Sequence, residues 1–303
     1  MFEPESSPHL RSFTSAEPIS VGSIETTDEH SPVRTPRFQH DLGDRMTAEW
    51  TWEPDDFAAL WLSNANDRFP RPLHYRSRFA YSEDFDAHRS TVRERYSRDE
   101  FEQVQLALHT LTTSDMRIEI RGGTTKHRSS NDTTREYRIV GARNLQHAVV
   151  MFQSAINGED GPIRLRMCRT DALPARIVNF LPGCNPGGMK PAIFHVQDLD
   201  LHRDGYFENA TRNAAREQYN RLLGRSSDGG GSAGLLVGSI LDRPAPRNTV
   251  RWYDISGDGR YTERRTADHI KIRPTTPQEL SLQFTSWVDS AVQRLREDAD
   301  DVL

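Results

Sequence analysis

The chain is poor in cysteine and has no long apolar run. Its two cysteines, Cys168 and Cys184, are too few for the disulfide framework of a small secreted domain, so we expect two reduced thiols, as is usual in the cytosol. No apolar stretch approaches the length of about eighteen residues that spans a bilayer, and no signal-peptide pattern is present. The sequence therefore predicts no membrane insertion.

An excess of positive charge is also lacking. The net charge is −5, and residues 1–45 hold four Arg against eight Asp and Glu, so most of the negative excess lies in that segment. A nearly neutral body argues against general nucleic-acid binding, which requires a basic surface. Residues 1–45 are rich in Ser, Pro and Thr and show no periodicity. We predict that they are disordered, with Met46 as an alternative translation start.

Four apolar-rich runs lie between Met116 and Arg169, where ten Lys and Arg stand against five Asp and Glu. Apolar and charged residues alternate in these runs, and clusters of Gly, Asn, Asp and Pro separate them, as is typical of strands and turns. We predict a four-stranded antiparallel meander with one apolar face and one basic, water-facing face. The basic face is expected to carry Arg117, Arg121, Arg138, Arg164 and Arg166.

The order helix, four strands, helix occurs twice, from Ser97 to Leu181 and from Asn209 to Arg296. Two such half-sheets side by side, with helices on their faces, predict one α+β domain with a central, largely antiparallel sheet in two quasi-twofold-related halves. We place this single domain at residues 46–303, with halves of about 46–183 and 190–303.

Two of the predicted helices begin with a capping box, in which a Ser or Thr and a Glu three residues later satisfy each other's backbone amides. One box is Ser97 with Glu100, and the other is Thr276 with Glu279, where Pro277 occupies the first helical position. These signals predict helix starts at both places.

Several short motifs imitate catalytic or metal sites. Gly229–Gly234 satisfies both G-x-G-x-x-G and G-x-S-x-G, but either motif must follow a strand and open a helix, whereas these glycines lead into the strand-like GLLVGSIL. The run from Asp254 to Gly259 resembles the start of an EF-hand loop, but Arg265 stands where the loop requires Glu. The histidines show no zinc-ligand spacing and no nucleophile has a base beside it. We expect no catalytic residue, no metal and no cofactor.

An ordered set of segments resembles the EspG family of type VII (ESX) secretion-associated proteins of actinobacteria. The resemblance extends from about Trp50 to Arg296, and it rests on FAALW, FPRPLHYRSRF, DEFEQVQLAL, MRIEIRGG, REYRIVGAR, GPIRLRMC, GGGSAGLLVG and RWYDISGDGRY. It implies a cytoplasmic, non-enzymatic chaperone whose sheet is flanked by helical bundles. It also implies a partner, the apolar tip of a PE–PPE helical heterodimer or a related type VII substrate, kept soluble and export-competent.

We expect partner binding on the basic sheet face and on the polar loop from Gly122 to Thr134, because a long loop beside an open face suits contact with another protein. The predicted partner-binding residues are Arg117, Arg121, Lys126, His127, Arg128, Arg138, Arg164 and Arg166. Two alternatives stay open at this point. One is a hydrolase or nucleotide-binding enzyme that uses Gly229–Gly234, and the other is a structural component of the secretion apparatus.

Overall fold

The computed structural model describes residues 48–63, 66–126, 133–199 and 209–300, with the side chains of 209–213 left out. All of the described elements belong to one compact unit. The segment predicted to be disordered, residues 1–45, lies outside the described residues. Within the described residues, no helix is both long enough and apolar enough to traverse a bilayer.

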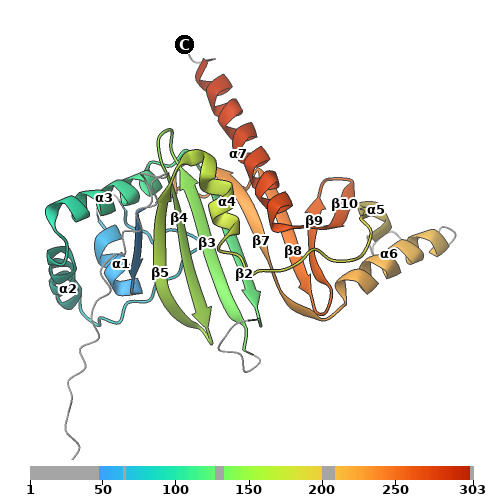
Figure 1. The fold of residues 1–303 in the computed structure, drawn as a ribbon, viewed down its shortest axis with the longest axis horizontal. Coiled ribbons are helices and arrows are strands. Elements are labelled where there is room, and N and C mark those ends of the chain that lie inside the picture. Colours follow the sequence, from blue (N-terminus) through green and yellow to red (C-terminus); the bar gives the residue numbers. More distant parts are fainter. Residues whose placement is uncertain (1–47, 64–65, 127–132, 200–208, 301–303) are drawn as a thin grey trace, which may run out of the picture. The chain divides into compact units, whose positions relative to one another are not determined.

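Ten strands form one sheet in which every neighbouring pair is antiparallel (Figure 1). In sheet order the strands are β1 (Glu49–Trp52), β5 (Glu159–Cys168), β4 (Ala148–Ile156), β3 (Arg135–Arg143), β2 (Met116–Thr124), β7 (Ser227–Val237), β8 (Asn248–Ile255), β9 (Gly259–Arg265), β10 (His269–Pro274) and β6 (Ala192–His195). The predicted antiparallel meander is confirmed as β2 to β5.

Helices cover both faces of this sheet. They are α1 (Pro54–Trp61), α2 (Ser82–Glu94), α3 (Arg98–Thr112), α4 (Leu173–Val178), α5 (Val196–Leu199), α6 (Asn209–Leu223) and α7 (Pro277–Asp300). Both predicted capping boxes are present: Ser97 and Glu100 bond reciprocally at the start of α3, and Thr276 and Glu279 do so at the start of α7. The α+β class is therefore confirmed.

The repeat is more complete than the sequence indicates. Each half consists of an edge strand, a group of helices, four sequential strands and a final helix: β1, α1–α3, β2–β5 and α4, then β6, α5–α6, β7–β10 and α7. The halves meet where β2 pairs with β7, and the sheet order is the same when read outward from this junction in either direction. Quasi-twofold symmetry about the β2–β7 junction follows.

The two faces of the sheet carry separate cores. We call face A the side on which Ile118 and Ile120 lie; there α4 and α7 cover the sheet around Phe284 and Trp287. We call face B the opposite side, to which Arg117 belongs. On face B, α1 and α3 pack against one end of the sheet, and α5 and α6 pack against the other (Figure 1).

Candidate functional site

The five sequence-predicted arginines do not share one face, so the expectation of a single basic platform is wrong. The register shows why: Ile118 pairs with Gly141, Gly141 with Val150, and Val150 with Arg166. Because directly paired residues lie on the same side of a sheet, the apolar face of β2 is the arginine face of β5. Arg164 and Arg166 therefore lie on face A, while Arg117, Arg121 and Arg138 lie on face B.

Arg117 is a buried structural residue with 2% of its surface exposed. Its guanidinium donates to a Glu119 carboxylate oxygen at 2.7 Å, and to the carbonyl oxygens of Gly238, Ser239 and Asp242 at 3.2, 2.8 and 2.9 Å. A fully engaged, buried guanidinium cannot reach a partner. Its role is to hold the segment after β7 against face B.

Arg121 and Arg138 are neighbours on face B but differ in their freedom. The Arg138 guanidinium is bonded to Asp160 and to Glu136, the latter at 3.1 Å. Arg121 is exposed, and no carboxylate of the described residues lies within 4.0 Å of its guanidinium. Of this pair, Arg121 is therefore the residue available for an intermolecular contact.

The centre of face B is open where β2, β7 and β8 run side by side. In register, Arg121 pairs with Ser232, and Ser232 pairs with Arg251, which makes a transverse row of polar side chains. All three residues are exposed, as is Thr249 one step along β8, whereas Glu119 is half-buried. We call Glu119, Arg121, Ser232, Thr249 and Arg251 the central platform.

Sequence reasoning missed Ser232, Thr249 and Arg251 as members of this platform. The available signal was the alternation in TVRWYDI, which places Thr249 and Arg251 on one face and Val250 and Trp252 on the other. What it could not supply was the pairing of β2 with β7, which joins residues more than a hundred positions apart, such as Arg121 and Ser232.

The remaining predicted residues lie away from the platform or outside the described chain. Lys126 is exposed and its ammonium group lies 2.5 Å from a carboxylate oxygen of Asp228, a hydrogen bond that raises the pKa of Lys126. His127 and Arg128 fall outside the described residues. On face A, Arg164 is exposed and Arg166 lies 3.7 Å from Glu49.

The glycine motif Gly229–Gly234 lies inside β7 rather than in a loop, and β8 is the element that follows. A phosphate-binding or nucleophile-elbow motif requires a helix at that point, so Gly229–Gly234 is neither of these motifs. The glycines make room for aromatic rings instead: a Cβ on Gly231 would lie 2.6 Å from the Trp252 ring, and Tyr137 donates to the Gly230 carbonyl at 2.9 Å.

The buried charges of β8 and β9 are paired. Arg260, 1% exposed, donates to both carboxylate oxygens of Asp254 at 2.7 and 2.8 Å, and to the Pro182 carbonyl at 2.9 Å. Burial raises the pKa of Tyr253 to about 12, and the nearby Glu263 carboxylate, which accepts its hydroxyl at 3.0 Å, adds to the effect. This tyrosine stays neutral and acts as a hydrogen-bond donor at physiological pH.

Metal-binding and thiol chemistry find little support in the described part of the chain. It contains no group of three His, Cys, Asp or Glu residues placed to hold a metal ion. Cys168 is a buried cysteine, and Cys184 is a half-buried thiol whose pKa is raised by burial. A raised pKa keeps the Cys184 thiol protonated and weakly nucleophilic.

Comparison with known proteins agrees with the family resemblance of the sequence. A model described as the EspG family matches residues 53–283. No curated protein matches the chain. A structure of the Mycobacterium tuberculosis type VII secretion system chaperone EspG5 in complex with a PE25–PPE41 dimer has a TM-score of 0.52 at 17% identity, and the match covers 78% of this chain and 94% of that chain. At this level of sequence identity, the structural match shows similarity of fold alone.

A second solved structure, HtdX of M. tuberculosis, matches with a TM-score of 0.17 at 11% identity over 55% of this chain and 79% of that chain. A TM-score this low does not indicate a shared fold.

Proposed function

The chain belongs to the EspG family, and from this premise we propose that it is a type VII secretion chaperone that binds a PE–PPE-type helical pair. The support is the family match over residues 53–283 together with a fold shared with a chaperone whose structure includes such a pair. In this proposal the protein acts in the cytoplasm, keeps its substrate soluble until export, and makes or breaks no covalent bond.

The central platform is the surface that we propose for the partner. It is a stretch of sheet left open on face B between helices that cover both ends, and its guanidinium groups at Arg121 and Arg251 have no carboxylate of the described residues within 4.0 Å. We assign partner binding to this surface because these two guanidinium groups are exposed on the sheet. Arg138, the register partner of Arg121, borders the platform, and the more distant Lys126 is included in the proposed contact surface.

The chemistry of a helical tip explains the use of arginine. The last four carbonyl groups of a helix lack intrahelical partners, and the helix macrodipole makes that end negative. Guanidinium groups with free N–H donors can bond several such carbonyls in fixed directions. Burial of the apolar side chains around the tip, in an interface of about 1,600 Å² in total, would then prevent the substrate from aggregating.

The test is binding of a PE–PPE-type pair encoded in the same genome, co-expressed and purified with the chain. We expect a stable complex, and a loss of affinity of at least about tenfold, roughly 1.4 kcal/mol, when Arg121→Glu and Arg251→Glu are combined. The matched control is Arg164→Glu, an exposed strand arginine on face A, which should bind as the wild type does.

The outcomes separate the possible surfaces. Weakening by Arg164→Glu alone would overturn the central platform and move the contact to face A. Failure to bind any PE–PPE-type pair would overturn the chaperone proposal itself.

A further inference from the structure

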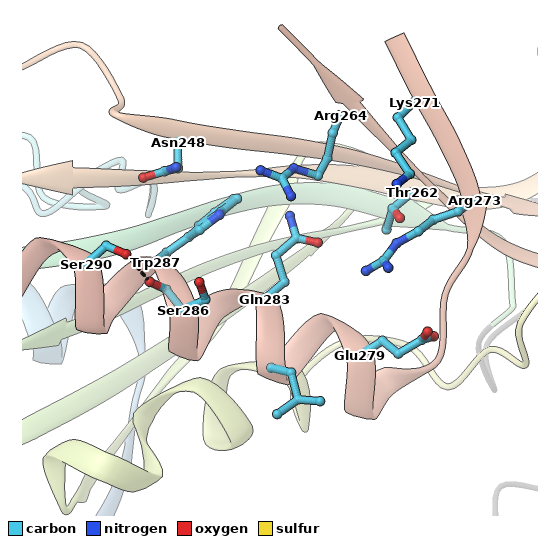
Figure 2. Close-up of a pocket in the computed structure, with 11 residues that line it drawn as sticks. Asn248, Thr262, Arg264, Lys271, Arg273, Glu279, Gln283, Ser286, Trp287 and Ser290 are labelled. Atoms are coloured by element: carbon cyan, nitrogen blue, oxygen red, sulfur yellow. Dashed lines mark hydrogen bonds between the residues drawn. The ribbon is translucent and has the colours of Figure 1, made fainter. Parts of the chain in front are cut away.

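A groove of about 440 Å³ lies on face A, between α7 and the strands β8 to β10 (Figure 2). It is separated from the central platform by the sheet itself. Three cationic side chains reach it from β9 and β10, and several side chains with polar groups, three of which matter below, reach it from α7. These six residues are Arg264, Lys271, Arg273, Glu279, Gln283 and Trp287.

The three cations are placed close together, and none of them is in an ion pair with a described residue. Arg264 and Lys271 are direct partners in the β9–β10 register, and Arg273 lies two residues along the same face of β10. Like charges directly opposite each other destabilise a sheet. Among the described residues, no carboxylate forms an ion pair within 4.0 Å of any of the three. An arrangement that costs stability and is left unpaired points to an external anion.

A second observation comes from α7. Gln283 is 8% exposed, and neither its amide nitrogen nor its amide oxygen has a hydrogen-bond partner; the indole N–H of Trp287, 4% exposed, also lacks one. Buried polar groups are normally satisfied, and each one left unmet costs free energy. Figure 2 shows Gln283 reaching from the helix toward the strands, between Arg264 and Arg273. Both residues with unmet groups therefore line the groove.

Glu279, the acid among these lining residues, is already engaged. Its carboxylate accepts from the Thr276 backbone amide at 2.8 Å and from the Thr276 hydroxyl at 3.1 Å, as the cap of α7. The backbone hydrogen bond from Thr276 lowers the pKa of Glu279, so the group is ionised at neutral pH. The groove accordingly contains three positive charges and one negative charge, the Glu279 carboxylate that already caps α7. Most of the hydrogen-bonding groups that it presents are donors.

We propose that this groove binds the phosphate group of a small anionic ligand. A ligand that fits must be rich in acceptors, because the guanidinium, ammonium and indole groups can only donate. It should carry close to two negative charges, since that is the excess of positive charge in the groove, and a phosphate monoester carries about that charge at neutral pH. The planar forks of Arg264 and Arg273 suit bidentate contact with phosphate oxygens.

This site is independent of the proposed chaperone function, since it lies on the opposite face from the central platform. Binding of a phosphate group can succeed or fail whether or not a helical partner docks on face B.

The experiment is titration calorimetry of the full chain with inorganic phosphate and, in a second arm, with O-phosphoserine, both at constant ionic strength set with chloride. We expect saturable one-to-one binding that weakens at least tenfold in Arg264→Gln and in Lys271→Gln, both of which are exposed and should not affect folding. The control is Arg265→Gln, the adjacent exposed arginine, which lies on face B and should bind like the wild type.

Tighter binding of phosphoserine than of phosphate would identify an ester as the ligand, and equal binding would identify the free anion; both support the site. Absence of saturable binding in both arms would overturn the proposal. An equal loss in Arg265→Gln and Arg264→Gln would also overturn it, because it would show that only the general charge of the surface is being measured.

Discussion

At the scale of single residues, similar sequence contexts lead to opposite environments. Arg117 and Arg164 each lie in an apolar strand run, yet Arg117 is sealed by three backbone carbonyls and Glu119, whereas Arg164 is exposed. The difference comes from the segment after β7, which crosses face B above Arg117 and needs its carbonyl groups satisfied. A buried guanidinium with several acceptors is costly to remove, because the acceptors remain behind without donors.

We therefore predict that Arg117→Met lowers the free energy of unfolding by about 3 kcal/mol, in the range found when one member of a buried charged network is removed. Arg164→Met, the matched exposed change on β5, should stay within about 0.5 kcal/mol of the wild type. Urea unfolding followed by far-ultraviolet circular dichroism measures both. Equal effects of the two substitutions would refute the structural role assigned to Arg117.

At the scale of elements, helix starts could be predicted from the sequence, whereas the faces that distant strands share could not. The capping boxes at Ser97 and Thr276 predicted the starts of α3 and α7 because all partners lie within four residues. The relative orientation of strand faces depends on the register from β2 through β3 and β4 to β5. Alternation within one strand contains no such information, which is why the basic face was wrongly assembled from β2 and β5.

The connection between α1 and α2 shows how a segment without regular structure is held by strand residues. Gln153, fully buried, accepts from the His74 backbone amide and donates to the His74 carbonyl, each at 2.8 Å. Asp160 on β5 is bonded to the His74 ring and to Arg138. Burial alone would raise the pKa of Asp160, but these two hydrogen bonds outweigh it and lower that pKa.

A pH dependence follows from this carboxylate. A pKa that is lower in the folded state means that Asp160 stabilises the fold above its unfolded value of about 4, and that the contribution is lost as the pH falls through the lower folded value. We predict that Asp160→Asn is less stable than the wild type at pH 7 and that the gap narrows below about pH 4. Asp268→Asn, which removes an exposed carboxylate, should show a negligible gap at both values. The check is urea unfolding of both variants at the two pH values, and an Asp160→Asn gap that does not change with pH would contradict the assignment.

At the scale of the whole molecule, the organising feature is the junction of the two halves. The sequence predicted two copies of helix, four strands, helix, but it gave no indication that β2 and β7 would be the strands that pair. Their pairing brings Gly122 and Gly123 opposite Gly231 and Gly230. Gly122 and Gly231 leave the space that the rings of Tyr137 and Trp252 fill, so the motif that imitated a phosphate loop serves packing and lets the halves share one sheet.

Because the sheet is continuous across this junction, we predict that the halves unfold together as one domain. A Cβ at Gly122 would lie 2.3 Å from the Tyr137 ring and 2.4 Å from the Gly230 carbonyl oxygen, so Gly122→Val must displace both sides of the junction. Overpacking of this kind costs about 3 kcal/mol. Native-state hydrogen exchange should show that amides of β4 and of β9, on opposite sides of the junction, lose protection by the same amount. Gly183→Ala, at an exposed glycine where a Cβ meets nothing within 4 Å, should leave both strands unchanged, whereas loss of protection in one half alone would show two independent domains.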